Sequence, residues 1–206
     1  QLRAENEQLH ALGIKSTCYF NSFVATDYKP VYQMLADKKY LTMNLKDDQP
    51  FTFRYMNFPA VGQLDFTNPN AVTWYQSVIE SAVKNMSFDG FMYDFAEYTP
   101  INSRFYNGKL GLEMHNPYTI LYQKAAYDYF VSLEQQPSDY APPYVYFHRS
   151  GYTQSGKYAW AHWTGDAGAD WSESSGLPAQ VTACLTSGLS GVGYCGSDIG
   201  GYVCFL

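Results

Sequence analysis

The sequence predicts an α/β fold built as a (β/α)8 barrel of the TIM type, of which this chain of 206 residues forms an incomplete central portion with about five of the eight strands. Three observations predict this fold. Apolar strand-like runs alternate with helical segments, which is typical of a parallel sheet with helical crossovers. Polar side chains follow these runs repeatedly. The sequence also lacks a Gly-rich phosphate loop of the dinucleotide or Walker type, which disfavours an open nucleotide-binding sheet.

The first expected elements are a polar helix that ends near residue 14 and an apolar, β-prone strand over residues 14–20. Residues 29–60 are expected to form an excursion from the main scaffold, because the pattern there is short and mixed. Within this excursion, residues 51–55 alternate like a strand and follow a turn-like stretch at 46–50.

The clearest helix start in the sequence lies before Pro69. Thr67 or Asn68 can cap the helix while the proline occupies its first position, and apolar residues then recur at helical spacing. We expect this amphipathic helix to run to about Met86 and to be followed by a buried strand over residues 88–95.

The second half of the chain continues the same rhythm. We expect helices over 117–133 and 179–185, and strands over 144–148, 158–163 and 191–195. The polar residues that follow the strands are Asn21, Asp94, Glu97, Arg149, Asp166 and Asp198. A barrel gathers the carboxyl ends of its strands on one face, whereas an open sheet spreads such groups too widely to act together.

Composition excludes several classes of function. The chain is 46% hydrophobic, which is enough for a globular core, and its net charge of −6 with a pI near 5.1 argues against a nucleic-acid partner. It contains no run of 18 uncharged apolar residues, so we expect no membrane insertion, and its polar first residues are unlike a signal peptide.

The cysteines leave two questions open. The four cysteines are Cys18, Cys184, Cys195 and Cys204. They are widely spaced, form no CxxC pair and have no histidine at ligand spacing, so no metal site is expected. Which of them pair in disulfides stays open. Asn85-Met86-Ser87 fits the N-glycosylation sequon. The sequon and the even cysteine count slightly favour a secreted or lysosomal location over a cytoplasmic one.

Two carboxyl groups are the candidates for chemistry. Asp94 ends an otherwise apolar strand, where a carboxylate needs a partner, and Asp166 stands between aromatic residues and a glycine. A helix cap, an ion pair or a turn would also explain either residue alone. Together, two such groups can cleave a glycosidic bond, one as nucleophile and one as acid and base, provided that they lie about 5 Å apart for retention.

The two roles need different surroundings. Apolar walls such as Trp163 and Trp171, or a neighbouring negative charge, would raise the pKa of the acid, while Arg149 or hydrogen bonds would keep the nucleophile ionised. Glu97 is interpreted as a partner that holds the nucleophile, and Asp170 as a capping or turn residue.

The motifs that carry these groups resemble those of glycoside hydrolase family 31, in the family's order and over essentially the whole chain. They are Asp89-Gly90-Phe91-Met92-Tyr93-Asp94-Phe95-Ala96-Glu97-Tyr98-Thr99-Pro100, Met114-His115-Asn116, Arg149-Ser150-Gly151, Trp163-Thr164-Gly165-Asp166 with Asp170-Trp171, and Ser197-Asp198-Ile199-Gly200-Gly201-Tyr202.

The resemblance implies a retaining α-glycosidase that needs no metal or organic cofactor. It makes Asp94 the nucleophile and Asp166 the acid/base. Substrate-binding roles fall on Arg149, Trp163, Asp198 and Tyr202, and supporting roles on Glu97 and His162. The family's first two strands, its last strand and its flanking β domains are not recognisable here, so residues 1–206 are expected to be a partial catalytic domain that works with the remainder of a longer chain or in an assembly.

The substrate stays open at this point. The motif Asp-Phe-x-Glu-Tyr-x-Pro resembles the bacterial α-glucosidase and sulfoquinovosidase branch, although Ala96 replaces the usual glycine and Thr99 a more apolar residue. Hydrolysis of an α-glucoside is the leading hypothesis. The alternatives are sulfoquinovoside hydrolysis, transglycosylation or lyase chemistry on the same scaffold, and a non-catalytic carbohydrate-binding or structural homologue.

Overall fold

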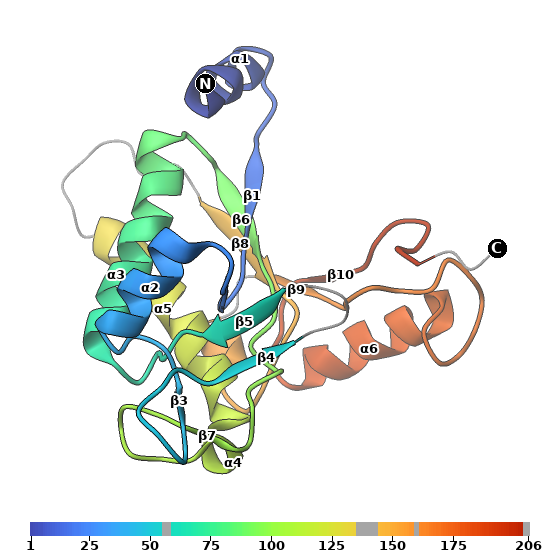
Figure 1. Cartoon of the computed structure of the whole chain (residues 1–206). Coiled ribbons are helices and arrows are strands. Elements are labelled where there is room, and N and C mark those ends of the chain that lie inside the picture. Colours follow the sequence, from blue (N-terminus) through green and yellow to red (C-terminus); the bar gives the residue numbers. More distant parts are fainter. Residues whose placement is uncertain (55–58, 135–143, 159–160, 204–206) are drawn as a thin grey trace.

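A parallel sheet forms the centre of the computed structural model, which describes residues 1–54, 59–134, 144–158 and 161–203 (Figure 1). Within these residues the sheet has five strands, in the spatial order β1 (Thr17–Phe20), β6 (Gly90–Tyr93), β8 (Val145–His148), β9 (Ala161–Trp163) and β10 (Cys195–Gly196). The spatial order follows the chain order and all pairs are parallel, as in consecutive strands of a (β/α)8 barrel. The predicted fold class is therefore confirmed.

Helices connect these strands and cover one side of the sheet (Figure 1). They are α3 (Pro69–Glu80), which continues into a π-helical turn at Ser81–Asn85, α5 (Pro117–Glu134) and α6 (Leu177–Leu189). The start of α3 is the predicted one, because the Asn68 side chain accepts a hydrogen bond from the backbone N–H of Asn70. At the N-terminus, α1 (Leu2–Ala11) stands apart from the other helices in Figure 1.

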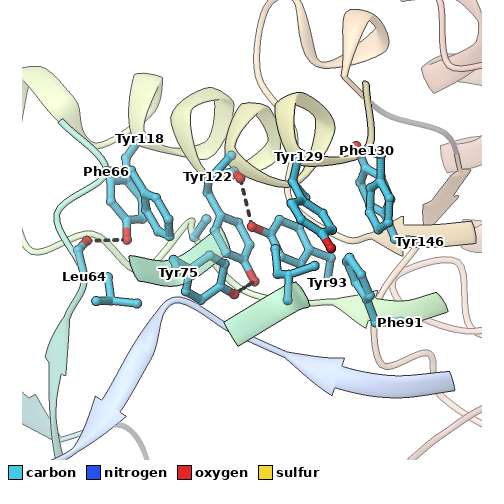
Figure 2. Packing of buried hydrophobic residues seen from close by; sticks show 14 of the residues in the cluster. Leu64, Phe66, Tyr75, Phe91, Tyr93, Tyr118, Tyr122, Tyr129, Phe130 and Tyr146 are labelled. Atoms are coloured by element: carbon cyan, nitrogen blue, oxygen red, sulfur yellow. Dashed lines mark hydrogen bonds between the residues drawn. The ribbon is translucent and has the colours of Figure 1, made fainter. Parts of the chain in front are cut away.

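The helix-facing core is built largely from tyrosines, which accounts for much of the aromatic content. Tyr93 of β6 stacks on Tyr122 of α5 with ring centroids 3.8 Å apart (Figure 2). Their hydroxyl groups are satisfied as well, since Tyr93 donates to the Tyr122 carbonyl and Tyr118 donates to the Leu64 carbonyl. Large rings therefore fill the core with most of their hydroxyls paired, although the buried hydroxyl of Tyr129 has no hydrogen-bond partner among the described residues.

The expected excursion is a small substructure between β1 and α3. Its antiparallel sheet consists of β2 (Phe23–Ala25), β5 (Ala60–Gln63) and β4 (Thr52–Arg54). The helix α2 (Lys29–Asp37) lies beside it, and β3 (Met43–Asn44) pairs with β7 (Ser103–Arg104) from the loop before α4 (Gly111–Met114). Residue 55, the end of one expected strand, lies outside the described residues.

Several predicted boundaries are wrong by a few residues, because pairing rather than local apolarity decides where a strand begins. The strand expected over 191–195 is β10, which starts at Cys195 where it meets His162 of β9. Before it, Gly191 adopts a positive φ of 87° and makes a turn instead of a strand. A short 3₁₀ helix (Ser155–Lys157) precedes β9, and residues 159–160 of that expected strand lie outside the described part.

Candidate active site

The predicted site residues lie at the carboxyl ends of neighbouring parallel strands. Asp94 follows β6 directly, Arg149 follows β8 directly, Asp166 comes three residues after β9, and Asp198 comes two residues after β10. The carboxyl group of Asp166 interacts electrostatically with the other three charged groups. The sheet thus gathers at one edge four residues that are far apart in the sequence, as a barrel is expected to do.

Asp94 is buried, with 5% of its surface exposed, and its carboxylate is surrounded by donors. Its Oδ1 accepts the backbone N–H of Phe95 at 2.8 Å and lies 3.1 Å from Nη1 of Arg149. Its Oδ2 accepts the hydroxyl of Tyr19 at 2.7 Å. These three contacts fix the direction of both oxygens.

Arg149 links Asp94 to Glu97. Its Nε and Nη2 both donate to Oε1 of Glu97, at 3.0 Å and 2.5 Å, while Nη1 faces Asp94. The guanidinium also lies over the rings of Phe95 and Trp163. The two carboxylates raise the pKa of Arg149, against the effect of its partial burial. Glu97 therefore reaches Asp94 through the arginine and not directly.

The backbone after Asp94 takes an uncommon shape. Phe95 and Ala96 both have positive φ angles, of 66° and 88°. Such angles cost about 1–2 kcal/mol per residue for side chains other than glycine, so two in succession need support from the surrounding structure. The resemblance places a glycine where this chain has Ala96, and the φ angle gives the physical reason. Thr99 fixes the turn by donating to the Ala96 carbonyl and accepting from Gln63.

Asp166 has the surroundings of an acid. Desolvation raises the pKa of its carboxyl group, and the negative charges of Asp94 and Asp198 raise it further, while Arg149 opposes them. Its side chain is exposed among the described residues, so solvent can reach it. Asp170 is exposed as well, but its Oδ1 accepts the N–H of Ser172 at 2.8 Å, and this bond lowers its pKa. This matches the interpretation of Asp170 as a turn residue.

Several buried polar atoms around these groups have no hydrogen-bond partner in the described structure. They are Glu97 Oε2, Trp163 Nε1, Thr164 Oγ1 and Asp198 Oδ2. Buried donors and acceptors are normally paired, so unpaired ones near these charged groups are candidates for contacts with a polar ligand. The set offers both donors and acceptors, which suits a molecule with several hydroxyl groups.

The two remaining predicted residues, His162 and Tyr202, lie at the margin of this group of charged side chains. His162 packs edge-to-face on His148 at 5.4 Å, and His148 contacts Gln123 of α5, so this pair lies on the helix-facing side of the sheet behind the site. Tyr202 is 67% exposed, and its backbone N–H donates to the Ala167 carbonyl. A small pocket next to it is lined by residues 167–171 and by Ser197, Asp198, Gly200 and Gly201.

Two features of the site were not assigned by the sequence. Tyr19 lies in the strand expected over residues 14–20, and its hydroxyl contacts the predicted nucleophile directly. The only available signal was its place near the end of β1, next to β6. The second feature is a disulfide between Cys184 of α6 and Cys195 of β10, which selects one of the pairings that spacing left open. Cys18 is a free thiol, and Cys204 lies outside the described residues.

The described residues contain no cluster of three or more histidine, cysteine or acidic side chains that could hold a metal ion. Over the same residues, none of the helices combines the length and apolarity needed to cross a membrane.

Comparison with known proteins decides the family. The family model described as the glycosyl hydrolases family 31 TIM-barrel domain matches residues 2–204. The chain belongs to glycoside hydrolase family 31. The family resemblance in the sequence is thereby confirmed, and so is the class of enzyme to which its relatives belong, since they are named sulfoquinovosidases, α-xylosidases and α-glucosidases.

Curated relatives match almost all of this family 31 chain. A sulfoquinovosidase of Escherichia coli is 33% identical over 202 residues, which is 98% of the chain and 29% of the relative. The α-xylosidase XylQ of Lactiplantibacillus pentosus is 32% identical over 198 residues, covering 95% and 24% of the two proteins. The chain thus spans less than a third of the length of these relatives.

Solved structures of family 31 members agree with the fold. A sulfoquinovosidase from E. rectale matches with a TM-score of 0.90 at 29% identity and covers all of this chain but 30% of its own. A cycloalternan-degrading enzyme from Trueperella pyogenes matches with a TM-score of 0.83 at 25% identity, over 98% of this chain and 28% of its own.

Proposed function

We propose that the protein containing this barrel segment hydrolyses α-glycosides with retention of configuration, with Asp94 as nucleophile and Asp166 as acid/base. The single observation that carries the proposal is the contrast between these carboxyl groups. Asp94 is buried and fixed by three hydrogen-bond donors, whereas desolvation and two neighbouring carboxylates raise the pKa of Asp166. Two carboxyl groups in such different surroundings are suited to the two roles of a retaining glycosidase.

The first step transfers the sugar to the enzyme. A carboxylate oxygen of Asp94 bonds to the anomeric carbon, the glycosidic C–O bond breaks, and Asp166 gives its proton to the leaving oxygen. In the second step water attacks the anomeric carbon, its proton passes to Asp166, and the bond to Asp94 breaks. Each step inverts the anomeric centre, so the product keeps the configuration of the substrate.

The other predicted residues would hold the sugar in the reacting position. Asp198 and Trp163 offer buried atoms without partners, an acceptor and a donor, to the hydroxyl groups. Arg149 remains on Asp94 and Glu97 and keeps the nucleophile in place. We include Tyr202 as an exposed residue at the entrance, and His162 as support from behind the sheet.

Two substrate classes are supported unequally. An α-linked glucoside is the leading candidate. Sulfoquinovosides are the second, because the relatives from Escherichia coli and Agrobacterium fabrum are named sulfoquinovosidases, at 33% and 29% identity. Transglycosylation, elimination from the same intermediate, or carbohydrate binding without catalysis would use the same scaffold and are outcomes of the tests below.

We also propose that this segment works within a longer protein. Both edges of the sheet, at β1 and β10, are open in the described structure, and α6 exposes apolar side chains. These include Leu177, Val181, Leu185 and Leu189, which are 48–90% exposed. Surfaces of this kind need cover from further strands and helices.

For the location, we propose an oxidising compartment such as the secretory or lysosomal route. The disulfide between Cys184 and Cys195 supports it, since disulfides are rare in reducing cytosol. The sequon asparagine, Asn85, is exposed at the end of the π-helical turn. Loss of mass on treatment with an N-glycosidase, in protein isolated from its source, would support this location, and a reduced, unmodified protein would contradict it.

The direct test of the reaction is the configuration of the first product. The full-length protein is incubated with 4-nitrophenyl α-glucoside and separately with the α-sulfoquinovoside, and the released sugar is followed by proton NMR. We expect the α-anomer to form first with one of the two. The variants Asp94→Asn and Asp166→Asn should each lose at least about a thousandfold in kcat. First appearance of the β-anomer, or activity that survives Asp94→Asn, would contradict the proposal.

A further inference from the structure

The contact between Tyr19 and Asp94 has no role in the mechanism so far. Tyr19 lies on β1, opposite Met92 of β6, so its side chain projects from the same face of the sheet as that of Asp94, two residues beyond Met92. Its hydroxyl donates to Oδ2 of Asp94 at 2.7 Å. The two oxygens of the nucleophile therefore have different partners.

The difference between the two oxygens is chemical. Oδ1 is held by a backbone N–H and by a guanidinium that is itself fixed on Glu97. Oδ2 has the Tyr19 hydroxyl as its hydrogen-bond partner among the described residues. Burial and the charge of Asp94 raise the pKa of Tyr19 far above its ordinary value, so the phenol keeps its proton and acts as a permanent donor.

We propose that Tyr19 is a further catalytic residue, which controls the lifetime of the glycosyl-enzyme; this inference rests on the proposed function. A hydrogen bond to a carboxylate is about twice as strong as one to a neutral acceptor. When the sugar is attached, Asp94 becomes a neutral ester, whichever oxygen carries the bond. The hydroxyl of Tyr19 therefore stabilises the free carboxylate more than the ester.

This preference acts on the second step. As water attacks, the bond between the anomeric carbon and Asp94 breaks, and its electron pair returns to the carboxylate, while the proton of the water goes to Asp166. Tyr19 keeps its own proton and stabilises the charge that develops on Asp94. During formation of the ester the charge on Asp94 is lost, so the hydroxyl of Tyr19 does not accelerate this step. Tyr19 thus speeds breakdown of the intermediate rather than its formation.

The conservative variant Tyr19→Phe isolates this effect. Phenylalanine keeps the aromatic ring of Tyr19 and lacks only the hydroxyl that contacts Asp94. Tyr28→Phe, on an exposed side chain directly before α2 and outside the proposed site, is the matched control. Equal melting temperatures of the three proteins show that they are folded alike.

The experiment measures formation and breakdown separately on the full-length protein. Each protein is labelled with a 5-fluoroglycosyl fluoride, freed from excess reagent, and followed as its activity returns. We expect reactivation of Tyr19→Phe to be roughly tenfold slower than that of wild type, with the labelling rate changed less than about threefold and Tyr28→Phe like wild type. A ring-fluorinated tyrosine at position 19, a stronger donor, should reactivate faster than wild type.

The outcomes separate the two proposals. If wild type is never labelled, the proposed retaining mechanism fails and Tyr19 loses its role with it. If wild type is labelled but Tyr19→Phe reactivates at the wild-type rate, or slows labelling and reactivation equally, the inference about Tyr19 is wrong while the mechanism stands.

Discussion

At the scale of single residues, buried charge sets how the protein responds to pH. His148 is fully buried, and this burial, together with the neighbouring His162, lowers its pKa to about 4 from an ordinary value of 6.5. In the unfolded chain this histidine binds a proton below about pH 6.5, whereas in the folded protein it does so only near pH 4. Folding is therefore opposed increasingly as the pH falls through this window.

We expect the free energy of unfolding to fall by about 3 kcal/mol between pH 6.5 and 4 on account of His148, since each pKa unit corresponds to about 1.4 kcal/mol. The measurement is denaturant unfolding at several pH values, for wild type and for His148→Gln. The variant lacks the titrating group and should lose less stability over the same range. Parallel pH dependences of the two proteins would contradict this assignment.

The sequence could identify the charged site residues because their signals are local. Asp94 and Asp166 each end an apolar run, and the charged groups around them follow other strands. Contacts between side chains of different strands leave no such local signal in the sequence. The hydroxyl of Tyr19 meets Asp94 only because β1 lies beside β6, and Glu97 acts through Arg149 only because β8 lies on the other side of β6.

At the scale of elements, β10 is the weakest part of the sheet. It pairs with β9 through two residues and lies at an open edge, yet it carries the loop of Asp198. The disulfide from Cys195 to Cys184 ties it to α6 across a sequence separation of 11 residues. Closure of a loop of this length contributes about 2–3 kcal/mol in the chain-entropy account.

The double variant Cys184→Ser/Cys195→Ser tests the role of this bridge. We expect backbone amides of residues 190–199 to exchange with deuterium faster than in wild type, because local opening no longer has to overcome the cross-link. The measurement is hydrogen exchange by mass spectrometry on the full-length protein. Cys18→Ser, which removes the free thiol of β1, is the control and should leave this segment unchanged. Unaltered exchange in the double variant would show that other contacts hold β10.

Boundaries of elements were predictable only where a local signal exists. Asn68 and Pro69 mark the start of α3 in the sequence and in the structure alike. Several strands are shorter than expected, and α6, at Leu177–Leu189, is longer than the expected helix over 179–185, because packing and register decide these limits. Gly90 shows how strict the register is, since a Cβ there would lie 1.9 Å from the carbonyl oxygen of Val145.

At the scale of the whole molecule, the order of strands and polar residues predicted a barrel segment correctly, because a barrel turns chain order into spatial order. Of the antiparallel sheet of β2, β4 and β5, only β4 falls within an expected strand, over residues 51–55; β2 and β5 were not predicted, since they are short and pair outside the barrel pattern. The open edges of the sheet agree with relatives that are more than three times as long as this chain.

The central claim is that Asp94 forms a covalent bond to the sugar. The full-length protein is incubated with a 5-fluoroglycosyl fluoride of the glucose series, and in parallel with a sulfoquinovosyl analogue, then digested and mapped by mass spectrometry. We expect one label, on Asp94, with one of the two reagents, and no label in Asp94→Asn. A label on Asp166 or Glu97, or turnover of substrate without any label from either reagent, would contradict the account.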